Sequence, residues 1–136
     1  KMRFLPKPVQ SPNIPILIGG TWPNKKPLQR SLKYDGYFPD VLQHPMTADD
    51  WKIVKELVKK AKGEEAPFDY VQYGVTPGDD RAAASALLKP FEEMGITWWI
   101  EGISPFDYGF DWGDPWTSEI VEKLERRIRQ GPPILD

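Results

Sequence analysis

Residues 16–26, ILIGGTWPNKK, decide the fold class. The run begins with three aliphatic residues and ends at two glycines, a pattern typical of a strand covered on both faces in a parallel sheet. Asn24 can cap a helix and Pro27 is tolerated in a first helical turn, so a helix is expected over residues 24–34. The stretch therefore predicts a strand that turns directly into a helix, the repeating unit of α/β proteins.

The same order recurs three more times along the chain. Thr47 and Asp50 have the spacing of a capping box at the start of the second helix. Pro90 is expected to kink or split the third helix, and the fourth is expected to begin with Asp114 as its cap and Pro115 at its first position. The expected strands are residues 16–18, 36–38 (ended by Pro39), 68–75 and 97–103; the helices are residues 24–34, 47–62, 79–94 (capped by Asp79 or Asp80) and 115–130.

Four strand–helix units in a row predict a parallel sheet with helices outside it. A complete (β/α)8 barrel takes about 250 residues. Four units in 136 residues therefore predict a (β/α)4 half of a TIM (β/α)8 barrel, formed by a single domain over residues 1–136. A small doubly wound sheet is the alternative, because four units could also build one. Closely spaced prolines predict an extended arm over residues 1–13.

The composition argues against several classes of function. A formal charge of −2 is not the basic footprint of a nucleic-acid-binding protein. No apolar run approaches the roughly 20 residues that a membrane helix needs. The absence of cysteine excludes a disulfide framework and a thiolate metal site, so a cytoplasmic protein is expected. His44 is the only histidine and is expected in an exposed loop, which leaves no Ser-His-Asp triad and no histidine-based metal cluster.

The turn after the first strand has the composition of an anion-binding site. Gly19 and Gly20 allow a ligand to approach the backbone closely, and Thr21 adds a hydroxyl donor. Lys25 and Lys26 in the first helical turn oppose the helix dipole at a cost of about 0.3–1 kcal/mol each, which a bound phosphate would reverse. The alternative is a tight turn with two solvated lysines.

Other candidate site residues lie at the later turns. Glu101, near the end of the fourth strand, stands where barrel active sites lie; it is either a catalytic carboxylate or the partner of an arginine or lysine in an ion pair. The turn at residues 76–79 is expected to be a capped helix start, because Asp79 and Asp80 would repel a phosphate. Trp98 and Trp99 should point to opposite faces of their strand. The aromatic loop at residues 104–113 could line an apolar pocket or close over a partner chain.

The sequence resembles the C-terminal half of luciferase-like flavin-dependent oxidoreductases. Residues 14–39 carry the resemblance most specifically, and it extends over nearly the whole chain. It implies a barrel that binds FMN or the deazaflavin F420, with the turn at Gly19, Gly20 and Thr21 helping to hold the flavin phosphate. It also implies hydride transfer or oxygen activation, often monooxygenation of a small organic substrate. The matching stretches are residues 8–10 (PVQ), 14–27 (IPILIGGTWPNKKP), 34–39 (YDGYFP), 95–101 (GITWWIE) and 128–133 (IRQGPP).

Half a barrel would need a partner. In the luciferase-like family the first four units supply much of the flavin-ring pocket and the substrate contacts, and these 136 residues have no counterpart of them. A lone four-stranded sheet would also expose two edges and an apolar inner face, which invite association. A homodimer that completes the barrel is therefore expected, unless a separate half-chain does so. The other functional hypotheses are a non-catalytic flavin-binding or interaction module and an unrelated phosphate-binding barrel enzyme.

Overall fold

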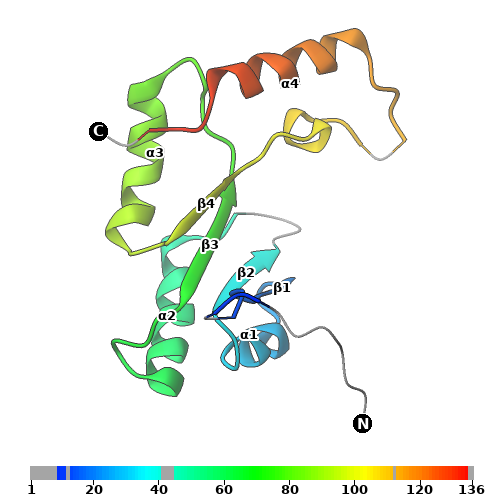
Figure 1. Ribbon diagram of the computed structural model, residues 1–136. Helices are drawn as coiled ribbons and strands as arrows, with labels where there is room; N and C mark the ends of the chain where they lie inside the picture. Colours follow the sequence, from blue (N-terminus) through cyan, green and yellow to red (C-terminus); the bar gives the residue numbers. More distant parts are fainter. Residues whose placement is uncertain (1–8, 12, 41–44, 112, 135–136) are drawn as a thin grey trace.

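The computed structural model describes residues 9–11, 13–40, 45–111 and 113–134. These residues form an α/β fold with a four-stranded, all-parallel sheet in the order β1-β2-β3-β4 (Figure 1). Most of the expected N-terminal arm and His44 lie outside the described residues. The elements are β1 (Leu17–Thr21), α1 (Lys25–Ser31), β2 (Gly36–Asp40), α2 (Ala48–Lys62), β3 (Asp69–Gly74), α3 (Arg81–Glu93), β4 (Trp98–Glu101), the 3-10 helix η1 (Pro105–Tyr108) and α4 (Ser118–Gln130).

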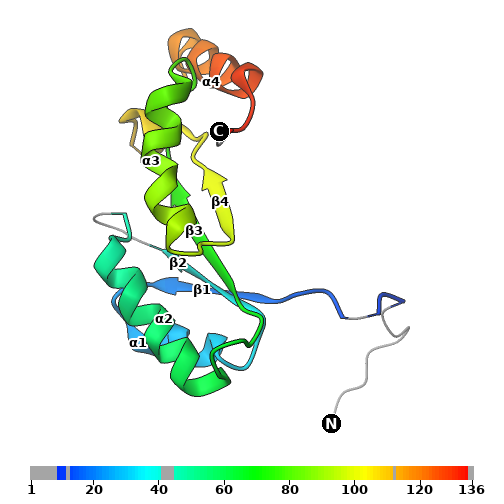
Figure 2. The same ribbon diagram turned by 90° about the vertical axis from the view of Figure 1, so that its left-hand side faces the viewer.

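Helices α1, α2 and α3 cover one side of the strands (Figure 2). On that side Trp99 packs against Phe91 of α3, with ring centroids 5.6 Å apart. Trp98, the preceding residue, lies on the other face and is 57% exposed, as expected for neighbours on a strand. A doubly wound sheet has helices on both faces and a reversal in its strand order. The consecutive strand order and the one-sided helix cover (Figure 2) are compatible with half of a (β/α)8 barrel.

The main core lies between the sheet and α1 and α2. Trp51 of α2 is fully buried; its indole N–H donates to Gln72 Oε1 at 2.6 Å, and its ring meets Tyr70 edge-on at 6.0 Å. Burial of apolar and aromatic surface of this kind makes a large favourable contribution to the free energy of folding. The buried members of this core are Trp22, Leu28, Tyr37, Met46, Trp51, Val54, Val58 and Phe68.

Strand β2 continues through Pro39, which was expected to end it. In a parallel ladder every second N–H points to the same neighbour. The Trp22 N–H donates to the Asp40 carbonyl, so residue 40 faces β1 and Pro39, one residue earlier, faces β3. The pairing of β2 with β3 ends at Tyr37 and Tyr70. The N–H that proline lacks would lie beyond that pairing, so Pro39 removes no hydrogen bond from the described ladder.

The capping residues of α1, α2 and α3 are those expected from the sequence. Asn24 and Asp80 cap α1 and α3, and Thr47 and Asp50 form a reciprocal capping box on α2. Pro90 was expected to kink or split α3; the helix is not split and runs through Pro90. Ala86, whose carbonyl loses its donor to the proline, is exposed, so solvent can replace that hydrogen bond.

The start of α4 differs from the expected one. Asp114 does not cap the helix, because its Oδ2 accepts the Asp111 N–H at 2.8 Å within a separate turn. The helix begins at Ser118, and the Thr117 side chain accepts the Ile120 N–H. In consequence α4 lies beyond the carboxyl ends of β3 and β4, close to the start of α3 (Figure 1).

Candidate functional site

The turn after β1 is held by both the sheet and α2. The Trp22 N–H donates to the Asp40 carbonyl and the Asn24 N–H donates to the Thr21 carbonyl, each at 3.0 Å. Trp22 is buried, and its indole N–H donates to Asp50 Oδ1 at 2.9 Å. The backbone that was expected to bind an anion is therefore fixed in place before any ligand arrives, which lowers the cost of binding.

The two glycines of this turn have different surroundings. A Cβ on Gly20 would overlap the ring of Pro27, so glycine is needed there for α1 to pack against β1. Gly19 faces the other side of the sheet, where a Cβ would meet only the Phe38 carbonyl oxygen, at 3.8 Å. The space expected for a ligand is thus open at Gly19 and filled by the protein itself at Gly20.

Lys25 and Lys26 are both exposed in the first turn of α1, which carries no acidic side chain. The capping side chain already accepts the Lys26 N–H at 3.1 Å, and Pro27 has no N–H. The donors offered to an anion are the Thr21 hydroxyl, the Lys25 N–H and the two lysine amines. Asp40 pairs with Thr21 across the strands, so one carboxylate lies at the same edge and opposes an anion.

Glu101, at the end of β4, forms a buried ion pair. Its Oε1 lies 3.2 Å from Nη2 of Arg127, and the two side chains are 10% and 6% exposed. The Thr76 N–H donates to Oε1 at 2.7 Å, and the Thr76 hydroxyl and the Trp99 indole N–H each donate to Oε2 at 2.9 Å. The structure therefore contains the ion pair that was one of the two alternatives for Glu101, and both carboxylate oxygens are engaged in it.

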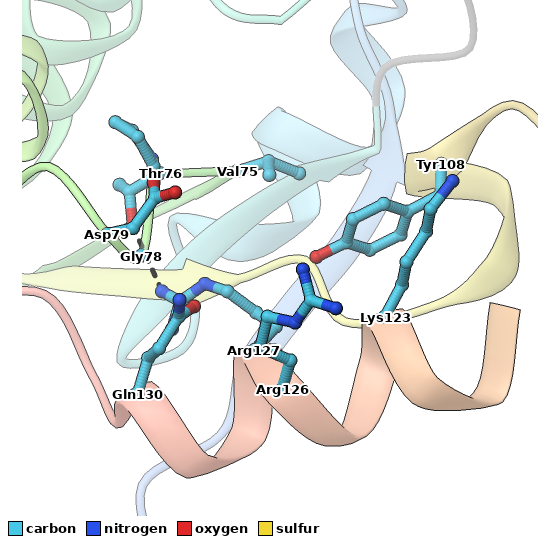
Figure 3. Close-up of a pocket in the computed structure, with 10 residues that line it drawn as sticks. Val75, Thr76, Gly78, Asp79, Tyr108, Lys123, Arg126, Arg127 and Gln130 are labelled. Carbon is cyan, nitrogen blue, oxygen red and sulfur yellow. Dashed lines mark hydrogen bonds between the residues drawn. The ribbon is translucent and has the colours of Figure 1, made fainter. Parts of the chain in front are cut away.

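Beside this ion pair a pocket of about 390 Å³ lies between the β3–α3 turn, η1 and α4 (Figure 3). Three cations of α4 line it, and the side opposite them is formed mainly by the turn at residues 75–79. Sequence reasoning did not pick out the cations, because their meeting with the turn depends on where α4 packs. Their helical spacing was the available signal, since residues three, four and seven apart share a face. The residues of α4 in the pocket are Lys123, Arg126, Arg127 and Gln130.

A second polar centre joins β3 to η1. The Tyr73 hydroxyl donates to Asp107 Oδ1 at 2.5 Å, while the N–H and hydroxyl of Ser104 each donate to Oδ2 at 2.8 Å. Burial, together with the hydrogen bond to Asp107 and its negative charge, raises the pKa of Tyr73 to about 12. The proton therefore stays on the phenol at neutral pH, and the pair fixes the start of the aromatic loop.

The aromatic loop lines a hollow of about 310 Å³ together with α4. Phe106 and Trp116 on its rim are 43% and 69% exposed. Among the described residues no group of three or more His, Asp or Glu side chains could hold a metal ion. None of the described helices combines the length and apolar character needed to cross a bilayer.

Comparison of the chain with models of known protein families, with curated proteins and with solved structures finds no match. The resemblance to luciferase-like proteins therefore stays a prediction from the sequence, and the geometry of the turn, the open sheet face and the pocket carries the functional argument.

Proposed function

We propose that the chain is one half of a flavin-binding (β/α)8 barrel. FMN or F420 would place its phosphate at the turn of Gly19, Thr21, Lys25 and Lys26, and its ring system against the open face of the sheet. The observation that carries the proposal is that face: consecutive parallel strands have helices on one side only. On the other side Leu17, Trp98 and Ile100 are 40%, 57% and 39% exposed.

A second half would cover that face. The outer strands β1 and β4 each pair with one neighbour within the described sheet, and unpaired strand edges favour pairing with another chain. Two copies of this chain related by a two-fold axis would pair β1 of each with β4 of the other. The barrel interior would then bury Leu17, Trp98 and Ile100 from both copies.

In this assembly the flavin would supply hydride transfer or oxygen activation toward a small organic substrate. The residues of this chain would do the binding: Lys25 and Lys26 would neutralise the phosphate, and the Thr21 hydroxyl would donate to it. The strand face, once the second half covers it, would exclude water from the ring system. Glu101 could enter proton transfer only after release from its four polar contacts.

A specific observation favours a second candidate, a non-catalytic flavin-binding or interaction module. The carboxylate of Glu101 was the one proton-transfer group suggested by the sequence, and Arg127, Thr76 and Trp99 hold both its oxygens. Each oxygen makes two polar contacts, so this carboxylate has no free lone pair directed at a substrate proton. The flavin-binding form of this module shares the flavin site with the first candidate and differs from it only in turnover, whereas an interaction module needs no flavin.

Titration with FMN and with F420, followed by flavin absorbance and fluorescence, tests the shared claim. The double variant Lys25→Gln/Lys26→Gln should weaken binding roughly tenfold or more, because it removes two charge-assisted contacts to the phosphate. Asp40→Asn should strengthen binding, because it removes the opposing carboxylate. Gly20→Asp is a poor probe, since any side chain there would collide with Pro27 and disturb α1.

The matched control is Lys60→Gln/Lys89→Gln, which changes the charge equally at exposed positions of α2 and α3. It should bind flavin as the unchanged chain does at the same ionic strength. Equal weakening in both double variants would show a general charge effect and would contradict a phosphate site at this turn.

A further inference from the structure

The pocket between the β3–α3 turn and α4 carries more positive than negative charge. Lys123, Arg126 and Arg127 line it, against one lining carboxylate, Asp79. Figure 3 shows the three cations along α4, with the turn opposite them and Tyr108 at one end. Such a concave site with converging donors is where a small anionic ligand gains most from binding.

Arg127 is the fixed part of this site. The residue is 5% exposed; its Nη1 donates to the Gly131 carbonyl at 2.6 Å, and its Nη2 donates to the Thr76 hydroxyl at 3.1 Å beside the Glu101 ion pair. Its Nε is buried and has no hydrogen-bond partner among the described residues. A buried donor without a partner costs about 1–3 kcal/mol, and the charge of Arg127 is held in place beneath the pocket by its other contacts.

Arg126 and Lys123 are the available charges. Arg126 is exposed and makes no ion pair or hydrogen bond within the part of the chain that the structure describes. Lys123 lies 2.9 Å from Glu119, but both side chains are largely exposed, so the pair is weak and can yield to a stronger anion. Both side chains can therefore close on a ligand at little cost.

The side of the pocket opposite α4 is formed by the turn that leads into α3. Helix α3 has thirteen residues, carries no acidic side chain in its first turn and begins at the pocket, so its dipole is positive there. The Asp80 carboxylate caps the helix, where it accepts the Ala83 N–H at 2.9 Å and offsets part of this dipole. Asp79 is exposed and free to turn into solvent. The sequence favoured a capped helix start without a ligand because it could not place the cations of α4 against this turn.

We propose that this pocket binds the phosphate group of a small phosphorylated ligand, at a site separate from the flavin turn. The Arg126 guanidinium and the Lys123 amine would donate to the phosphate oxygens, the fixed Arg127 would add its charge beside them, and the Tyr108 hydroxyl would close one end. The proposal rests on the pocket geometry alone and stands whether or not the chain binds flavin.

The test is NMR titration of the chain with inorganic phosphate at constant ionic strength, following the side-chain Nε–H signal of Arg127 and the amide of Gly78. Both signals should shift in a saturable manner, and acetate should bind more weakly, because it offers fewer acceptors and less charge. Arg126→Gln should weaken phosphate binding about tenfold, the loss expected for one charge-assisted hydrogen bond. Arg126 is exposed and unpaired, so this variant should fold normally.

Arg129→Gln is the matched control. Arg129 lies on the same helix, is 80% exposed and pairs only weakly with Glu125, at 3.4 Å, so its loss should leave phosphate affinity unchanged. No saturable shift at either signal, equal weakening by both substitutions, or equal affinity for acetate would overturn the proposal. An unchanged response to FMN in Arg126→Gln would confirm that the two sites are separate.

Discussion

At the scale of single residues, Glu101 and Arg127 show how one ion pair organises a site. Removing both charges from water is costly, and the cost is offset here because Thr76 and Trp99 also donate to the carboxylate. The pair holds α4 against the carboxyl ends of β3 and β4. It also explains why Arg127 is fixed beside the pocket while Arg126, the next residue, stays free to bind a ligand.

Tyr73 gives a residue-scale prediction about pH. Its pKa is raised from about 10 to about 12 in the folded chain, so folding favours the protonated phenol. The stability that this provides is complete below pH 10 and is lost as the pH rises from about 10 through about 12, because only the unfolded tyrosine ionises in that window. The urea midpoint should therefore fall more between pH 9 and pH 11 in the unchanged chain than in Tyr73→Phe.

Burial also raises the pKa values of Tyr37 and Tyr70, but both proteins in this comparison keep these residues. The difference between the two midpoints then reports Tyr73 alone. If the fall is the same in both proteins, the hydrogen bond to Asp107 does not protect the phenol, and the position of η1 needs another explanation.

At the scale of elements, the sequence predicted what local contacts determine. Asn24, Thr47, Asp50 and Asp80 cap their helices because a cap depends on residues within one turn. The start of α4 could not be predicted in this way. Asp114 is an equally good cap by type, but it closes a turn with Asp111, a competition that only the folded loop decides.

The two candidate sites also differ in how far the sequence could predict them. The turn after β1 is continuous in sequence, so its residues could be named in advance. The pocket joins residues 75–79 with Arg126 and Arg127, some fifty positions away, and no periodicity within either segment indicates that they meet. Gly20 is intermediate between these cases: the glycine was identified, but its reason, the contact with Pro27, is a packing contact.

Gly20 and Gly19 give the element-scale prediction. Gly20→Ala should destabilise the chain by about 1–3 kcal/mol, because its methyl group would force Pro27 and α1 away from β1. Gly19→Ala should have a much smaller effect, since the nearest atom to its methyl group is 3.8 Å away. Urea denaturation of the two variants measures the difference. Equal destabilisation would show that the packing of α1 on β1 is not the reason why position 20 requires glycine.

At the scale of the whole molecule, the four strands leave one face and two edges uncovered within the described fold (Figure 2). Trp98 on that face is more than half exposed, an unfavourable position for the largest apolar side chain. A second half-barrel would bury it and pair both edges at once. Binding of the flavin ring system therefore depends on the second half-barrel, because only the second half covers the face on which the ring system would lie.

Sedimentation velocity with FMN or F420 present, recorded in the visible flavin band, tests this claim most directly. The account predicts that flavin absorbance sediments with a species of about twice the 15.6 kDa mass of the chain. It also predicts that Lys25→Gln/Lys26→Gln lowers the flavin absorbance carried by that species while the protein remains a dimer. A protein that sediments at 15.6 kDa with both flavins remaining free in solution would contradict the half-barrel account.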